Sequence, residues 1–176
     1  MRYLSVTSVL LLLVVFVTRC SEEAAPTAFL IDSSIENPAL SKTVVHHVSV
    51  GGADICEALG LPTGCDANFS LVANEMANGS VSGQWQDTFR INGQGVPVHV
   101  TIDCINVVGK EAWVSGVITG GPFTGVLAIT RVADNGKSAN DPLDQISFIS
   151  QDIFGGCQAE PDLPLIDLTH GQVTVK

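Results

Sequence analysis

The chain has 176 residues, of which 45% are hydrophobic and 15% charged, and its formal net charge is −10. That length is enough for one domain with a substantial hydrophobic core. Arg2 and Arg19 precede position 20, so the remainder keeps six of the eight basic residues against all 18 acidic ones. Such a surface has no basic stripe to neutralise phosphates, which excludes nucleic acid and disfavours anionic lipid headgroups as partners.

The N-terminal segment has the pattern of an export signal. An apolar run at residues 4–17 follows a basic start and ends shortly before Cys20, so residues 1–20 are set apart from the fold. A cysteine at this junction resembles the end of a bacterial lipoprotein signal, which implies lipidation of Cys20 and a membrane-anchored mature end. Arg19 stands where those signals have a small residue, so conventional cleavage within residues 24–28 and an uncleaved anchor remain alternatives.

The next segment is predicted to be a tether. Residues 21–42 are polar and acidic, contain Pro26 and Pro38, and show no sustained hydrophobic period. This composition is typical of a flexible linker that holds a domain away from a membrane. Residues 43–176 are then expected to form a single β-domain.

The domain is expected to begin with one strand and one helical turn. Residues 43–50 are rich in β-branched side chains and are followed by the breaker pair Gly51-Gly52. Residues 54–65 hold the one plausible helical turn, and Cys56 and Cys65 bracket it. A disulfide between these cysteines would close a short loop and contribute at most about 2–3 kcal/mol.

Period-two alternation is the strongest indication of fold. Asn78-Gly79 is a strong hairpin signal, and two alternating runs follow it. The inward positions are Val81, Gly83, Trp85, Phe89 and Ile91 in the first run, and Val96, Val98, Val100, Ile102 and Cys104 in the second. His99, Thr101 and Asp103 are expected to face outward. Half-buried antiparallel strands have this pattern, and helices do not.

Further short strands are expected towards the C-terminus, at residues 112–119, 123–132, 146–150 and 172–176. Strands separated by turns about every ten residues, with almost no helix, predict an all-β fold built as an antiparallel meander. Closure of the meander as a barrel and closure as a two-sheet sandwich satisfy the same alternation, so both remain open.

Several turn and core motifs resemble those of a known group. They are NGSVSGQ at 78–84, IDCINVVG at 102–109, VSGVIT at 114–119, VADNG at 132–136, DQIS at 144–147 and GQV at 171–173. Together they resemble a group of small secreted bacterial β-domain proteins with no assigned biochemical role, over residues 69–176. The resemblance implies the fold and carries over no active site. A weaker, purely architectural likeness is to barrels of the avidin and lipocalin kind, and architecture does not imply a ligand.

The candidate ligand-binding residues are Trp85, Asp87 and Trp113. Asp87 interrupts the apolar face of its strand, and a carboxylate inside a barrel can bind a polar ligand group or act as a base. The alternative is a bulge or strand end that brings Asp87 to water. Trp85 and Trp113 are the only tryptophans, and such residues either line a pocket or fill the core. No catalytic residue is assigned.

An acidic loop is the best candidate for a cation. Asp134, Asp141 and Asp144 offer the hard oxygen ligands that calcium prefers, although the loop lacks the EF-hand pattern. The competing interpretation is that Asn135-Gly136 simply makes a turn. No other cofactor is expected.

The cysteines fit an oxidising compartment. Without Cys20 the chain keeps an even set of four, which allows three connectivities. We prefer Cys104 with Cys157, which ties a central strand to the C-terminal segment, and this leaves Cys56 with Cys65.

These observations favour an exported, membrane-tethered β-domain with a non-enzymatic binding role in the cell envelope. Its partner would be a small apolar or polar molecule or an envelope protein, with the membrane contacted only through the N-terminal anchor. One alternative is a barrel-type enzyme that encloses an apolar substrate around the internal carboxylate of Asp87. The other is a purely structural surface protein with a filled core.

Overall fold

A computed structural model describes residues 42–53, 66–91, 94–138 and 140–176. Within these residues the chain forms one antiparallel sheet of ten strands, which confirms the predicted all-β class. The strands are β1 (Val44–Ala53), β2 (Asp66–Met76), β3 (Val81–Ile91), β4 (Gln94–Val108), β5 (Glu111–Gly120), β6 (Leu127–Ala133), β7 (Gln145–Ser147), β8 (Ser150–Gln151), β9 (Leu165–Asp167) and β10 (His170–Val175). The export signal with Cys20, most of the tether, the 54–65 turn and the Cys56–Cys65 pair lie outside the described residues.

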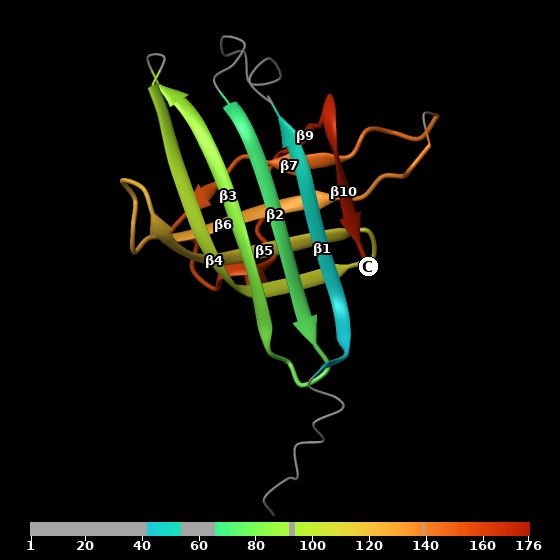
Figure 1. Cartoon of the computed structure of the whole chain (residues 1–176). Helices are drawn as coiled ribbons and strands as arrows, with labels where there is room; N and C mark the ends of the chain where they lie inside the picture. Colours follow the sequence, from blue (N-terminus) through green and yellow to red (C-terminus); the bar gives the residue numbers. More distant parts are fainter. Residues whose placement is uncertain (1–41, 54–65, 92–93, 139) are drawn as a thin grey trace, which may run out of the picture. The chain divides into compact units, whose positions relative to one another are not determined.

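The sheet curls into a half-barrel. Its strand order is β10-β1-β2-β3-β4-β5-β6-β7-β9, with β8 paired to β6. Figure 1 shows β1 to β4 as one layer that crosses over β5 and β6. The 15-residue strand β4 belongs to both layers, and its pairing with β5 shifts register at His99/Val100 and at Ile102/Cys104. Such bulges bend a strand, so β4 forms the corner at which the sheet folds over itself.

The β2–β3 hairpin has the predicted turn. Gly79 takes the left-handed conformation, with φ of 80°, and Asn78 Oδ1 accepts hydrogen bonds from the Ser80 N–H and hydroxyl at 3.1 and 2.8 Å. A Cβ at Gly83 would collide with the Val72 carbonyl oxygen, so this glycine lets β2 and β3 approach closely.

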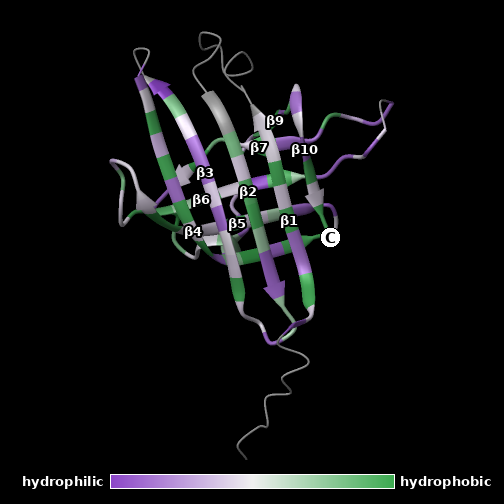
Figure 2. Ribbon diagram, in the orientation of Figure 1, coloured by the Kyte–Doolittle hydropathy of each residue, from purple (hydrophilic) through white to green (hydrophobic). Residues whose placement is uncertain are grey.

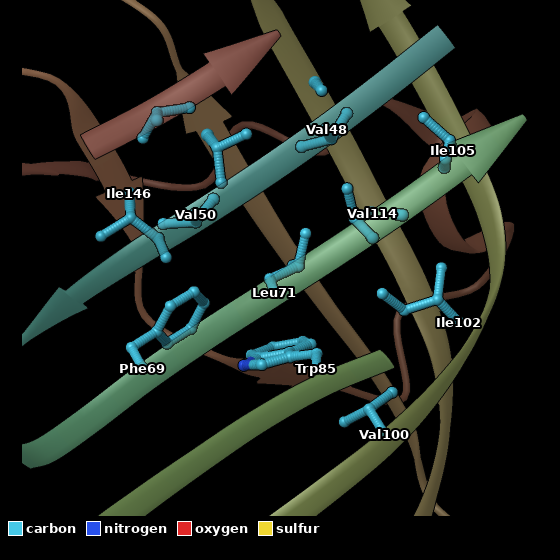
Figure 3. Packing of buried hydrophobic residues seen from close by; sticks show 14 of the residues in the cluster. Val48, Val50, Phe69, Leu71, Trp85, Val100, Ile102, Ile105, Val114 and Ile146 are labelled. Carbon is cyan, nitrogen blue, oxygen red and sulfur yellow. The ribbon is translucent and has the colours of Figure 1, made fainter. Parts of the chain in front are cut away.

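The main core lies on the inner face of the curled sheet. Hydrophobic and hydrophilic residues alternate along β1 to β4 (Figure 2), and the hydrophobic ones meet inside. Trp85 and Leu71 are the largest side chains that are fully buried there, and valines and isoleucines from β1, β4, β5 and β7 surround them (Figure 3). The predicted inward positions of β3 and β4 are therefore confirmed for Trp85, Val98, Val100 and Ile102.

Cys104 is the exception, and its predicted inward position is wrong. The bulge between Ile102 and Cys104 shifts the alternation by one residue, so that Ile105 continues the inner face. Cys104 instead packs with a second cluster on the other side of the sheet, formed by Trp113, Ile129, Cys157 and Leu163.

The C-terminal segment covers that second cluster. Cys157 lies in a short 3₁₀ helix, η2 (Gly156–Ala159), and forms the predicted disulfide with Cys104, at a Cα–Cα distance of 5.9 Å. The Cys157 N–H donates to Ser115 Oγ at 3.2 Å, and Trp113 Nε1 donates to the Pro161 carbonyl at 2.9 Å. We call residues 152–164 the strap, because their 3₁₀ helix contacts β4, β5 and β6 and their apolar side chains pack on the second cluster.

Arg131 joins the strap to the sheet through its charge. Its guanidinium lies 5.2 Å from the centre of the Trp113 ring, an arrangement that is attractive between a cation and an aromatic face. It also pairs with Glu111 at 2.7 Å and with Asp162 of the strap at 3.0 Å. The second cluster is therefore closed by a polar rim as well as by the disulfide.

Two carboxylates close the free edge of β10. The backbone N–H groups of the even-numbered residues of β10 point towards β1, while those of Val173 and Val175 point away from it. Asp144 Oδ2 accepts the Val173 N–H at 2.6 Å, and Asp134 Oδ2 accepts the Val175 N–H at 3.1 Å. Both aspartates are buried, with 8% and 2% of their surface exposed. We call this contact between β10 and the ends of β6 and β7 the carboxylate seam; residues 134–144 lie between these two strands.

Three predicted strand boundaries are wrong. The first strand continues through Gly51 and Gly52 and pairs there with β10, where a Cβ at Gly171 would collide with the Gly51 carbonyl oxygen. Residues 123–126 form a turn before β6, closed by a hydrogen bond from the Val126 N–H to the Phe123 carbonyl. The expected strand at 146–150 is split between β7 and β8, which pair with different parts of β6.

We expect the substitution Asp144→Asn to weaken the carboxylate seam. The Asp144 carboxylate accepts the Asn135 N–H at 2.8 Å with its second oxygen, whereas an amide has only one acceptor oxygen. One buried N–H would lose its partner, and the free energy of unfolding should fall by about 1–3 kcal/mol in urea denaturation.

Asp141→Asn is the matched control for that substitution. Asp141 is exposed and uses a single oxygen, Oδ2, to accept two loop N–H groups, a role that an amide oxygen can fill. Its effect should stay within about 0.5 kcal/mol. Equal losses for the two variants would contradict the role given to the seam.

Removal of the strap disulfide should destabilise the domain more than removal of the other predicted pair. The bridge joins residues 53 positions apart. By the chain-entropy estimate it contributes about 4 kcal/mol, against about 2–3 kcal/mol for a short loop. Guanidinium unfolding of Cys104→Ala/Cys157→Ala and of Cys56→Ala/Cys65→Ala would compare the two. A larger loss in the second double variant would be inconsistent with the strap as a stabilising element.

Candidate functional site

Trp85 and Asp87 project from β3 into the inner face of the half-barrel. The strand register places Trp85 between Leu71 of β2 and Val100 of β4, and Asp87 between Phe69 and Val98. Trp85 is fully buried, and 4% of Asp87 is exposed. The neighbours of both residues across the sheet are apolar.

Asp87 does not reach water through a bulge or a strand end. The pairing of β3 with β4 runs without a break from Gly83 to Ile91, and Asp87 lies in the middle of it. The alternative that brought Asp87 to solvent is therefore wrong. A carboxylate at this position introduces a polar, ionisable group into an otherwise hydrophobic face, which is uncommon without a structural or functional reason.

The indole N–H of Trp85 is the second polar group on this face. Nε1 is buried and has no hydrogen-bond acceptor within the described part of the chain. Figure 3 shows this nitrogen on the side of the ring that lies towards Phe69, whose ring centre is 5.5 Å from that of Trp85. Buried tryptophan N–H groups usually find a partner, so this one is a candidate to bind a water molecule or a ligand atom.

Trp113 lies away from these two residues. It belongs to the second cluster on the opposite face of the sheet, where its own Nε1 donates to the strap. The structure brings together Trp85 and Asp87 of the predicted ligand set, and it does not bring Trp113 to them. Side chains alternate between the two faces along β5. Ala112 and Val114 pack in the main core, so Trp113 between them faces outward.

The three aspartates predicted for calcium serve other contacts. Asp134 and Asp144 accept the β10 N–H groups, and Lys110 Nζ lies 3.7 Å from Asp134 Oδ1. Asp141 accepts the N–H groups of Ser138 and Lys137, and these two hydrogen bonds lower the pKa of its carboxyl group. Within the described ranges, no group of three or more acidic, histidine or cysteine side chains could hold a metal ion. Calcium binding here stays a prediction.

The described residues line two hollows that bear on the predicted sites. The larger, about 330 Å³, lies over the seam and is lined in part by Ser138, Asp141, Asp144 and Gln172. The smaller, about 120 Å³, lies between β3, β4 and β5 and is lined mainly by Gln84, Gln86, His99 and Thr101 together with Thr119. Trp85 and Val100 also line the smaller hollow, and Asp87 lines neither of the two.

Sequence reasoning missed the structural role of Asp134 and Asp144. The available signal was their position: each flanks an apolar strand, and Val173 and Val175 follow in the last strand. Nothing in the spacing showed that the last strand would meet them, because that contact depends on how the sheet curls.

No protein-family model, curated protein or solved structure matches this chain. The predicted resemblance to small secreted bacterial β-domain proteins, and to avidin and lipocalin barrels, stays a prediction. Within the described ranges, none of the helices has the length and apolar character that a bilayer crossing requires.

Proposed function

We propose that this chain is an exported, membrane-tethered binding protein of the cell envelope, and that its β-domain binds a small molecule without chemically changing it. The observation that carries the proposal is the buried indole N–H of Trp85, which lacks an acceptor in the described residues and lies two positions from buried Asp87. Polar groups that converge on an apolar surface are the usual composition of a ligand site.

The surroundings of Trp85 suggest the chemistry of the ligand. Phe69, Leu71 and Val100 are its close neighbours, so most of the ligand surface would be apolar. The free N–H calls for one acceptor, such as a carbonyl oxygen. The carboxylate of Asp87 would repel an anion, so a neutral or cationic molecule is favoured.

The proposed location rests on the cysteines and the N-terminal pattern. A disulfide between Cys104 and Cys157 persists best in an oxidising compartment, which agrees with export. The apolar run before Cys20 supplies the proposed signal and anchor. In this proposal the membrane is contacted only through that anchor.

Prodan (6-propionyl-2-dimethylaminonaphthalene) is a suitable first probe, because it is neutral, largely apolar and carries one carbonyl. It also accepts excitation energy from tryptophan. We expect saturable quenching in the Trp113→Phe variant, which keeps Trp85 as its only tryptophan. In Trp85→Phe the affinity for prodan should fall about fivefold, the usual value of one hydrogen bond.

The two tryptophan variants serve as controls for each other. Thermal unfolding would verify that both remain folded before titration. Failure of prodan to saturate the wild-type protein, or equal affinities in the two variants, would count against a ligand site at Trp85 and favour the structural alternative with a filled core.

The substitution Asp87→Asn separates binding from the enzymatic alternative. We would incubate wild-type protein and the Asp87→Asn variant with an organic extract of the producing cells and analyse the retained compounds by mass spectrometry. Binding predicts that both proteins retain the same unchanged compound, with affinities that differ less than about threefold, because the amide keeps the shape of the side chain. A product formed by wild-type protein and not by the variant would instead support an enzyme with Asp87 as its internal carboxylate.

A further inference from the structure

The tip of the strap displays a phenylalanine to solvent. Phe154 is 98% exposed, more than twice the fraction found for Phe123 and Phe148, the other exposed phenylalanines of the described residues. Full exposure of a large aromatic ring is unfavourable by the hydrophobic effect, by about 2 kcal/mol relative to burial. Scattered surface residues are common, but a ring with almost all of its surface in water is unusual enough to require an explanation.

The backbone around Phe154 is held in an uncommon conformation. Asp152 and Glu160 are the two non-glycine residues with positive φ in the described residues, at 53° and 46°, and they flank Phe154 on either side. Gly155 and Gly156 between them are also left-handed. Non-glycine residues in this region cost free energy and persist where the surrounding structure enforces them, often at binding sites.

Contacts at both ends of this turn enforce that conformation. On one side the Asp152 N–H donates to the Leu127 carbonyl of β6 at 3.1 Å. On the other, Cys157 is fixed by the disulfide, and Asn106 donates to Glu160 Oε1 at 2.9 Å. Ile153, directly before Phe154, packs against the second cluster. The backbone of the turn is therefore fixed on both sides, while the ring of Phe154 remains exposed.

We propose that residues 152–156 form an interaction site at which Phe154 inserts into an apolar pocket of another protein. A rigid, pre-positioned aromatic anchor loses little conformational entropy on binding, and such residues often dominate the energy of an interface. Asp152 and Glu160 are both exposed and lie on either side of Phe154 in the chain, so a partner with basic residues beside its apolar pocket is favoured.

The same carboxylates argue against two other occupants. An anionic membrane surface would repel Asp152 and Glu160, and a single aromatic ring adds little membrane affinity. A second copy of the chain is also disfavoured. The chain has 18 acidic residues against eight basic ones, so two copies would repel each other.

Site-specific photocrosslinking in the producing cells tests the proposal. The full chain would carry p-benzoyl-phenylalanine at position 154 or, as a matched control, at position 108. Val108 is also apolar and 50% exposed. It lies at the β4–β5 turn, near the C-terminal end of β6, whereas the strap contacts the N-terminal end of β6 through Leu127. We expect one protein to be crosslinked from position 154 and not from position 108.

Binding of the captured protein, once purified, must then depend on the ring. Phe154→Ala should weaken the dissociation constant about tenfold or more, as for an interface hot spot, while Phe154→Trp stays within about threefold and Val108→Ala has no effect. Asp152→Asn and Glu160→Gln should lower the association rate and its dependence on salt. Thermal unfolding should be unchanged by Phe154→Ala, because the ring has few contacts to lose.

Four outcomes would overturn the proposal. The first is no crosslink at position 154 above that at position 108, and the second is a crosslink to lipid alone. The third is a crosslink only to a second copy of the chain. The fourth is a captured protein that binds the Phe154→Ala variant as tightly as it binds the wild type.

Discussion

Asp144 and Asp134 accept the N–H groups of Val173 and Val175, which point away from β1, and the closed core of this domain depends on that contact. A complete barrel removes its free edges by pairing its first strand with its last, but here the strand path ends at β10 and β9 without joining them. Unpaired N–H groups at such an edge would lie against the core with no acceptor. Charged acceptors form stronger hydrogen bonds than neutral ones, so two side chains can replace part of a missing strand pair. Val173 and Val175 can then lie in the main core beside β1 although their own strand is an edge.

The second constraint is the bend in β4. A regular strand of 15 residues would keep every second side chain on the same face, and Cys104 would have pointed into the main core. The bulge after Ile102 reverses the alternation and directs Cys104 to the outer side, where it meets Cys157. This bulge thus contributes to the corner of the half-barrel and produces the attachment point of the strap. It also explains why two tryptophans of one small domain, Trp85 and Trp113, lie in separate clusters on opposite faces of one sheet.

The parts of this fold that follow from local pattern could be predicted from the sequence. Alternation of apolar and polar residues identified the inward face of β3, including Trp85, and Asn78-Gly79 identified the hairpin turn. A bulge leaves no comparable signal. Cys104 and Ile105 are both apolar, so the sequence fits either alternation, and the choice depends on the tertiary curl. The burial of Asp87 could not be predicted from the sequence either, because a carboxylate in an apolar run is compatible with a bulge, a strand end or an internal site. The seam depends on residues about 30 to 40 positions apart, a separation at which local pattern carries no information.

The two proposed sites lie on opposite sides of the same sheet, and this placement has a consequence for how they would act. Trp85 belongs to the inner face, whereas the strap and its turn are fixed to the outer side of β4, β5 and β6. Coupling between two sites requires an element that has two arrangements and contacts both. The sheet between them is held by antiparallel strand pairing that shifts register twice between β4 and β5, and the strap by a disulfide and side-chain hydrogen bonds. No such element is apparent in the described residues. Because the two proposed sites lie on opposite faces of the sheet, the domain could hold a small molecule on its inner face and a protein at Phe154 at the same time.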